Sequence, residues 1–224
     1  MTDNDPTEPT TERTRVRRAA DRGRYDTETV HSILDDEQVA HVGFVVDGSP
    51  VVIPMLYGRD GDDLWLHGSV ASRLVRRLSE GVEVCVEVTI VDAYVMARSA
   101  FHHSMNYRSV VVFGTAELVT DDDEKLHGLR AITDHLAPGR WDEVRGPDRR
   151  ELRQTAVLRL RIDEVAAKVR GHGVVDDEED LGLDVWAGLV PVVRTLGSPV
   201  PDGDLAPDVV LSPSIVALVE SSGS

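Results

Sequence analysis

The chain has a single cysteine, Cys85, among its 224 residues, which excludes an internal disulfide and is typical of a reducing compartment. Long apolar runs are also absent, as is a hydrophobic signal region at the N-terminus, so we expect a cytoplasmic protein without membrane association. The patterns G-x-S-x-G, H-E-x-x-H and G-x-G-x-x-G do not occur. Their absence disfavours nucleophilic catalysis and favours chemistry supplied by a bound cofactor.

Positive charge is scarce as well. Lysine and arginine number 24 against 40 aspartates and glutamates, giving a formal net charge of -16. Such a chain repels polyanions, so we expect neither nucleic acid nor anionic membranes as partners. Residues 1–20 have almost no apolar pattern and are predicted to form a flexible tail. We expect the arginines that begin at Arg13 to lie on the protein's own acidic surface or on a sister subunit.

The apolar pattern predicts about six or seven strands joined mostly by short turns. Asp47-Gly48 is a strong hairpin signal between the predicted strands 39–46 and 49–57. Asp26 and Asp121 are good N-caps for two predicted helices. Further strands are expected at 82–91, 93–101, 107–120 and, as the last one, 155–162. We therefore predict a mainly β, α+β fold, a small antiparallel barrel over residues 21–170 with an irregular extension over 171–224.

The most informative stretch is LWLHGSVASRLVRRL, residues 64–78. A short strand breaks at small residues and leads directly into a helical pattern. A helix start leaves backbone N–H groups unpaired at the positive end of the helix dipole. The hydroxyls of Ser69 and Ser72 and the guanidinium of Arg73 add donors there, and His67 lies at the strand end. This turn predicts a phosphate-binding site, and hence a phosphorylated cofactor.

Several segments together resemble the flavin-nucleotide-binding branch of the pyridoxamine 5'-phosphate oxidase superfamily, which includes nitroimidazole-resistance reductases. The segments are VVIPMLYG, LHGSVASRLVRRL, ARSAFHHSMNYRSVVVFG, PGRWDEVR and AAKVRGHGVVDDEEDLGLDVWAGLVP. The resemblance covers the chain from about Arg13 to Pro201. It implies a six-stranded antiparallel split β-barrel that forms a homodimer, with FMN bound at the subunit interface.

The resemblance also implies a set of cofactor-binding residues. Those expected to line the isoalloxazine ring are Ile53, Pro54 and Met55. Those expected to hold the ribityl phosphate are His67, Ser69, Ser72 and Arg73. Those expected on the long strand facing the same cleft are Tyr107, Arg108 and Ser109. Those expected to reach a flavin from the C-terminal part are Lys168, Arg170 and Trp186.

Some of these expectations meet local constraints. Tyr107 and Ser109 share one face of a strand and Arg108 the other, so either the Tyr/Ser pair or Arg108 meets the ligand. True pyridoxamine phosphate oxidases carry Ser-Arg-Lys in the phosphate turn, whereas Leu74 follows Arg73 here. Oxidation of pyridoxamine phosphate is therefore disfavoured. His102 and His103, on opposite faces of a predicted strand, make a poor metal site, and no metal site is expected.

These observations favour an FMN-dependent oxidoreductase that acts on a small organic molecule. No catalytic residue is assigned, although Tyr107 or His102 is a candidate proton donor. One alternative is a flavin-binding or flavin-sequestering module without its own catalysis, because no substrate cluster is evident. Another alternative is haem binding in the same cleft, with His67 or His102 as axial ligand.

Overall fold

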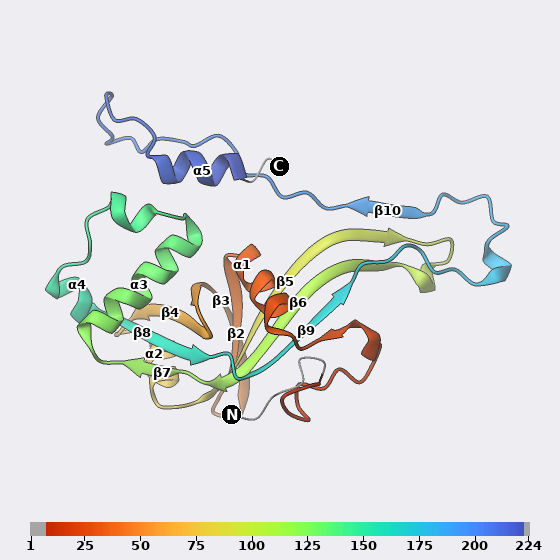
Figure 1. Ribbon diagram of the computed structural model, residues 1–224, viewed down its shortest axis with the longest axis horizontal. Coiled ribbons are helices and arrows are strands. Elements are labelled where there is room, and N and C mark those ends of the chain that lie inside the picture. Colours follow the sequence, from red (N-terminus) through yellow and green to blue (C-terminus); the bar gives the residue numbers. More distant parts are fainter. Residues whose placement is uncertain (1–7, 222–224) are drawn as a thin grey trace. The chain divides into compact units, whose positions relative to one another are not determined.

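The computed structural model describes residues 8–221, apart from the side chains of residues 73 and 74 (Figure 1). The chain divides into two compact units. The first unit is built from residues 8–55, 83–114 and 161–193, and the second from residues 56–82, 115–160 and 194–221. Each unit therefore draws on segments that are far apart in the sequence.

The first unit is an antiparallel sheet with one long helix. Its strands are β1 (Gly23–Arg24), β2 (Val39–Val46), the first half of β3 (Ser49–Asp60), β5 (Glu83–Met96), β6 (Ser104–Thr115), β9 (Glu164–Arg170) and β10 (Gly188–Pro191). Its helices are η1 (Ala20–Arg22), α1 (Thr27–Asp36), η2 (Ala100–His102) and η4 (Glu178–Asp180). The strands pair in the order β1-β9-β6-β5-β2-β3, and β10 adds to β5.

Local chemistry explains these elements. Asp26 caps α1 by accepting a hydrogen bond from the Thr29 amide at 2.8 Å, as predicted. Asp47 and Gly48 both have positive φ, 50° and 80°, which is the backbone that a tight two-residue hairpin requires. Alternate residues of β2, β5, β6 and β9 are buried, as in a sheet with one face on a core. Val30, Ile33 and Leu34 of α1 are buried as well.

The second unit combines the end of β3 with three further strands and most of the remaining helices. Its strands are β4 (Asp63–Ser69), β7 (Glu117–Val119) and β8 (Thr155–Arg161), paired in the order β3-β4-β8-β7. Its helices are α2 (Arg73–Ser79), α3 (Asp122–Leu136), η3 (Arg140–Glu143), α4 (Arg149–Gln154) and α5 (Pro213–Ser221). Asp121 caps α3 through the Glu124 amide at 2.9 Å, again as predicted.

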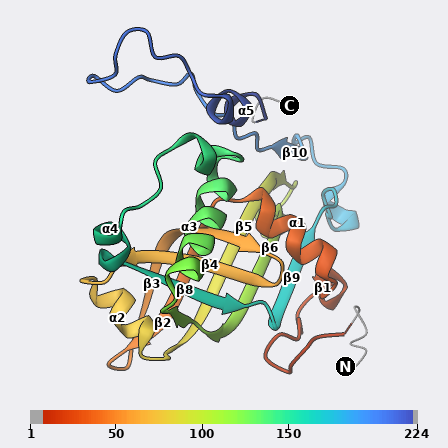
Figure 2. The same cartoon turned by 60° about the vertical axis from the view of Figure 1, so that its left-hand side comes forward.

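Two glycines let α3 pack closely on the strands of this unit (Figure 2). A Cβ atom added at Gly58 of β3 would lie 2.4 Å from the backbone carbon of Ala131. A Cβ atom added at Gly128 of α3 would lie 2.4 Å from the Trp65 ring. Trp65 and Ile132 belong to the small core beneath the helix. Backbone therefore meets backbone at Gly58, and side chains meet the helix backbone at Gly128, so no larger residue fits at either position without a shift of its neighbours.

The predicted class, mainly β with helices, is confirmed, but the strand count differs. Ten strands occur in the described residues, against the six or seven expected. Two of the additional strands, β1 and β10, have two and four residues, too few to show a repeating pattern. The predicted strand 107–120 is divided at Ala116 into β6 and β7. The prediction that 155–162 is the last strand was wrong, because β9 follows it in antiparallel pairing with β6.

The predicted boundary within residues 82–101 was also wrong. One strand, β5, runs from Glu83 to Met96 without a break, and a turn containing η2 then leads to β6. His102 and His103 therefore lie in that turn and not on opposite faces of a strand. Among the described residues, no helix is both long enough and apolar enough to cross a membrane.

Candidate functional site

The ladder between β6 and β9 brings four predicted site residues onto one face of the first unit. Tyr107 is directly opposite Arg170, and Ser109 is directly opposite Lys168. Directly opposed residues of an antiparallel pair project to the same side of the sheet. The Ser109 hydroxyl lies 3.5 Å from the carbonyl oxygen of Lys168, to which it donates. Tyr107 and Ser109, one of the two alternatives for contact with the ligand, thus lie on one face of this ladder. Arg108, the other alternative, lies on the opposite face.

Arg108, on the opposite face, is occupied by carboxylates. Its Nη2 donates to Asp92 at 3.0 Å, and its Nη1 donates to Asp36 of α1 at 2.5 Å. The hydrogen bonds to these carboxylates, Asp92 first, raise the pKa of the guanidinium. Arg108 therefore joins α1, β5 and β6, and two negative charges already compensate its own.

Arg170 has a different environment. Its side chain is 4% exposed, and its recorded partners are all neutral oxygens, those of Asn106, His172 and Gly173. The buried Nε atom has no partner. Burial lowers the pKa of the guanidinium, and the neighbouring Arg22 lowers it further. A buried cation without a carboxylate is unusual, because buried charges are normally paired.

A pocket of about 290 Å³ lies on the same face of the β6–β9 ladder, beneath the N-terminal segment. We call residues 8–18 the arm and this cavity the arm pocket. Its lining residues are Arg13, Thr14, Arg15, Val16, Arg17, Arg18, Ser109, Val111, Phe113, Ala166, Ala167 and Lys168. The floor is thus apolar and the rim basic, and two predicted site residues, Ser109 and Lys168, contribute to it.

Arg13 fastens the arm to the sheet. Its Nη1 donates to Glu83 at 2.6 Å, and its Nε donates to Glu164 at 3.1 Å. Its guanidinium carbon lies 4.5 Å from the centre of the Phe113 ring, which is a cation–π geometry. The hydrogen bonds from Arg13, followed by that from Thr11, lower the pKa of Glu164. The arginine series thus contacts the protein's own acidic surface at Arg13, one of the two placements expected.

The predicted phosphate turn belongs to the second unit. Ser72 is the N-cap of α2 but makes no side-chain capping hydrogen bond, while the Ser69 hydroxyl accepts from the Ala71 amide at 3.2 Å. His67 is half-buried, and its Nδ1 atom is buried without a partner. Burial lowers the pKa of the imidazole, which favours its neutral form. The Arg73 side chain lies outside the described residues.

Histidines also occupy the turn between β5 and β6 in the first unit. His102 Nε2 lies 3.1 Å from a carboxylate oxygen of Asp177, and His103 Nδ1 lies 2.8 Å from the carbonyl oxygen of Ser99. An imidazole that donates Nδ1–H to a backbone carbonyl presents Nε2 for a ligand. No group of three or more His, Cys, Asp or Glu side chains in the described residues is arranged to hold a metal ion.

The remaining predicted residues are more exposed. Ile53 and Met55 are half-buried on β3, and Pro54 between them is exposed. Trp186 is 66% exposed and its ring lies against Gly188, where an added Cβ would be 2.9 Å away. Sequence reasoning did not assign Arg13 or Phe113 to a site, although arginines at alternate positions and the alternating run Val111, Phe113 were visible in the sequence.

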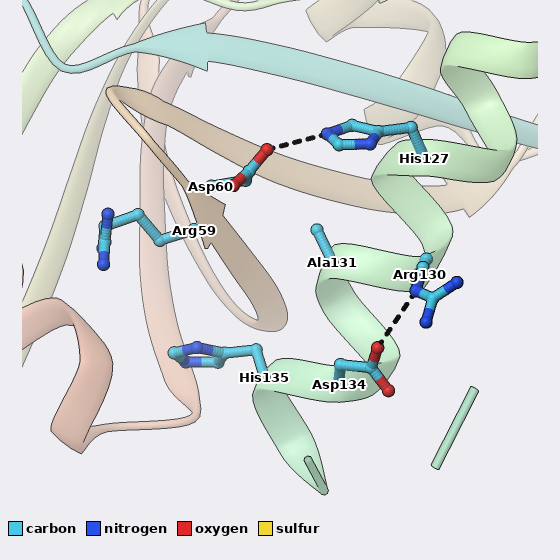
Figure 3. A pocket seen from close by; sticks show the side chains of 7 residues that line it. All are labelled: Arg59, Asp60, His127, Arg130, Ala131, Asp134 and His135. Carbon is cyan, nitrogen blue, oxygen red and sulfur yellow. Dashed lines mark hydrogen bonds and ion pairs between the residues drawn. The ribbon is translucent and has the colours of Figure 1, made fainter. Parts of the chain in front are cut away.

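A second pocket, of about 360 Å³, lies in the second unit between the end of β3 and α3 (Figure 3). We call it the α3 pocket. Its lining residues are Arg59, Asp60, His127, Arg130, Ala131, Asp134 and His135. Asp60 lies 2.9 Å from His127 Nε2, and Asp134 lies 3.4 Å from Arg130 Nε. Both acidic side chains of this pocket are thus paired with a basic side chain of its wall.

Comparisons with known proteins agree on the family. A sequence profile described as pyridoxamine 5'-phosphate oxidase matches residues 26–169. A search of curated proteins gave no match. Among solved structures, the flavocytochrome Anf3 from Azotobacter vinelandii is 40% identical with a TM-score of 0.88, over 94% of this chain and 98% of its own.

Two further structures extend this picture. A FAD and haem binding protein from Mycobacterium smegmatis is 38% identical with a TM-score of 0.85, over 88% of this chain and 97% of its own. A protein assigned to 5-nitroimidazole antibiotic resistance, from Bacteroides thetaiotaomicron, is 24% identical with a TM-score of 0.54, over 64% of this chain and 84% of its own, and supports the fold alone. The predicted split-barrel class is confirmed, and the chain belongs to the pyridoxamine 5'-phosphate oxidase family.

Proposed function

We propose that this protein binds a flavin and a haem and passes electrons between a reduced donor and a small organic acceptor. The observation that carries the proposal is similarity over nearly the whole chain to two proteins whose descriptions combine a flavin or flavocytochrome with haem. When bound, the flavin supplies two-electron chemistry and the haem supplies one-electron chemistry. The protein supplies binding, orientation and the electrostatic environment.

The polar groups that lack partners fit such cofactors. A neutral imidazole is the usual histidine ligand of haem iron, and His67 has a lowered pKa and an unpartnered Nδ1. His103 is the second candidate ligand, because its contact with the Ser99 carbonyl orients Nε2 outward. The buried Arg170, which lacks a carboxylate, suits an anionic group of a cofactor.

We propose that the flavin is FMN or a related flavin nucleotide such as FAD. The family resemblance implies FMN, with Ile53, Pro54 and Met55 at the ring and Ser69, Ser72 and Arg73 at the phosphate. The mycobacterial relative is described by FAD instead. We also propose a cytosolic homodimer with the cofactor at its interface, since the described surface exposes large apolar residues such as Phe101, at 88%, and Val52, at 63%.

The test is the visible absorption spectrum of the purified protein, combined with mass spectrometry of the released cofactors. Flavin bands together with a Soret band are expected. His67→Ala and His103→Ala should each be compared with His31→Ala, a change on α1. Loss of the Soret band in one of the first two variants identifies an axial ligand. A protein that retains neither cofactor after reconstitution would refute the proposal.

Catalysis is tested separately from binding. Reduction of the bound flavin by NADH or NADPH, followed by reoxidation with a nitroaromatic acceptor, would support an oxidoreductase. A stably bound flavin that neither donor reduces would favour a flavin-sequestering module.

A further inference from the structure

The arm pocket combines features that the flavin and haem proposal does not use, although Ser109 and Lys168 in its lining are among the residues that the family resemblance implies for a flavin. Among the described residues, five of its lining side chains are cationic, those of Arg13, Arg15, Arg17, Arg18 and Lys168, and none is acidic. The whole chain, by contrast, carries a net charge of -16. A concentrated basic rim on an acidic protein marks a place where an anion is bound selectively.

Part of this positive charge is already compensated and part is not. Arg13 is bound by Glu83 and Glu164, and Arg15 and Arg17 are both bound by Glu12. For the side chains of Arg18 and Lys168, no hydrogen bond or ion pair is recorded within residues 8–221. These two cations come from different segments, the arm and β9, and both line the same pocket.

The floor determines what kind of anion fits. Val111, Phe113 and Ala166 present an apolar surface between the two strands, with the Ser109 hydroxyl as a polar group beside Lys168. Free inorganic phosphate gains nothing from such a floor. A molecule with a flat apolar body and one anionic group uses both parts of the pocket. A volume of about 290 Å³ accommodates a body of one or two rings.

We propose that the arm pocket is a binding site for a small aromatic anion, a carboxylate or a phosphate ester. Lys168 and Arg18 contact the anionic group, and the aromatic body lies on the floor formed by Val111, Phe113 and Ala166. The arm residues that close this pocket lie outside the segment that the family profile matches, residues 26–169. Lys168 is also among the residues that the family resemblance implies for a flavin, so the retention of flavin is followed together with ligand binding.

Chemical footprinting provides the most direct test, because Lys168 and Lys125 are the only two lysines of the chain. Both are half-buried, and Lys125 lies on α3, so it serves as an internal control. The purified protein, with whatever cofactors it carries, is acetylated with an amine-reactive reagent with or without 1-naphthoate or 1-naphthyl phosphate. We expect mass spectrometry to show severalfold slower acetylation of Lys168 and unchanged acetylation of Lys125.

Calorimetric titration of the same ligands then measures affinity. Lys168→Met keeps the aliphatic stem but removes one charge-assisted contact, and we expect about tenfold weaker binding of 1-naphthoate. Lys125→Met should bind like the wild type. Stronger binding of the carboxylate than of the phosphate ester, or the reverse, identifies the preferred anionic group.

Specific outcomes would overturn the proposal. Equal binding of neutral 1-naphthalenemethanol would mean that the cations play no part, and equal binding of inorganic phosphate would mean that the floor plays none. Unprotected Lys168 in the footprint would remove the site itself. Release of flavin in step with naphthoate binding would assign the pocket to the flavin. Retained flavin with no naphthoate binding would refute this inference and leave the proposed function standing.

Discussion

The arm pocket and the α3 pocket are similar in size and rich in arginine, but they differ in how their charges are compensated. In the α3 pocket, Asp60 pairs with His127, and Asp134 pairs with Arg130. In the arm pocket no acidic residue lines the wall, and the cations of Arg18 and Lys168 have no recorded partner within residues 8–221. Charged side chains alone do not indicate a binding site. What indicates one is charge that the fold leaves uncompensated.

The two pockets also differ in what holds their walls. The α3 pocket is bounded by a helix whose backbone contacts β3 at Gly58, so its walls move only if the helix moves. The arm pocket is closed by a segment held largely through Arg13, whose side chain is 39% exposed. We therefore expect the α3 pocket to be rigid and the arm pocket to open when few contacts are lost.

The largest expected effect is the loss of stability in a variant that disrupts the wall of the α3 pocket. Gly58→Ala places a methyl group 2.4 to 2.6 Å from backbone atoms of Ala131 and Ile132, which cannot rotate away. Overpacking of this kind costs about 1–3 kcal/mol. Urea unfolding should show this loss of stability, while Gly146→Ala, at a position with nothing within 4 Å, should not. Equal stability of the two variants would contradict the proposed rigidity.

The second effect opens the arm pocket and leaves the α3 pocket intact. Arg13→Ala removes the ion pairs with Glu83 and Glu164 and the contact with Phe113. We expect tryptic cleavage after Arg17 and Arg18 to become severalfold faster. Arg15→Ala is the matched control, because Arg15 pairs with Glu8 and Glu12 of the arm itself. Equal acceleration in both variants would mean that Arg13 does not fasten the arm.

A third prediction concerns α5 in the second unit, which the carboxylate of Glu143 holds just as Glu83 and Glu164 hold the arm in the first unit. Glu143 accepts hydrogen bonds from the hydroxyl and the amide of Ser214 in α5, and these lower its pKa from 4.5 to about 2. A lowered carboxyl pKa in the folded state stabilises the protein above pH 4.5, and this contribution is lost as the pH falls toward 2.

The difference in Tm between wild type and Glu143→Gln should therefore be largest near neutral pH and should shrink between pH 4.5 and about 2. Thermal unfolding followed by circular dichroism over this range measures it. Glu28→Gln, at an exposed position on α1, should show no such convergence. A difference that grows as the pH falls would contradict the assigned role of Glu143.

The smallest effect is expected for the paired charges of the α3 pocket. Arg130 is 49% exposed and shared between Asp134 and Asp142, and exposed pairs of this kind contribute about 0.2–1 kcal/mol. Arg130→Gln should accordingly change the free energy of unfolding by less than about 1 kcal/mol. It should also leave binding of naphthoate unchanged. Loss of naphthoate binding in this variant would mean that the anion binds in the α3 pocket and not in the arm pocket.

Much of the fold was predictable because it rests on local signals. The caps at Asp26 and Asp121 and the turn at Asp47 are fixed by residues that are adjacent in sequence. The strands β1 and β10 were missed because a two- to four-residue strand exists only through its partner. The strand β9 was missed because Ala166 and Ala167 weaken the apolar alternation.

The arrangement of the candidate site residues was predictable only where they lie on a single strand. Alternation along β6 separated Tyr107 and Ser109 from Arg108, and the structure adds that Arg108 is neutralised by Asp92 and Asp36. That neutralisation joins residues 16 and 72 positions apart, which no local pattern reveals. The arm pocket needed the arm, β6 and β9 together, so its closure by residues 13–18 was not foreseen. We propose haem, considered from the sequence as an alternative to flavin, as its companion, because a similar protein is described as binding both FAD and haem.

The measurement that tests the central claim most directly is the absorption spectrum of the purified protein, before and after reconstitution with FAD, FMN and haem and removal of the excess. Flavin bands and a Soret band that both stay with the protein are expected. A colourless protein that retains none of these cofactors would contradict the proposed function, and would limit the likeness to its relatives to the fold.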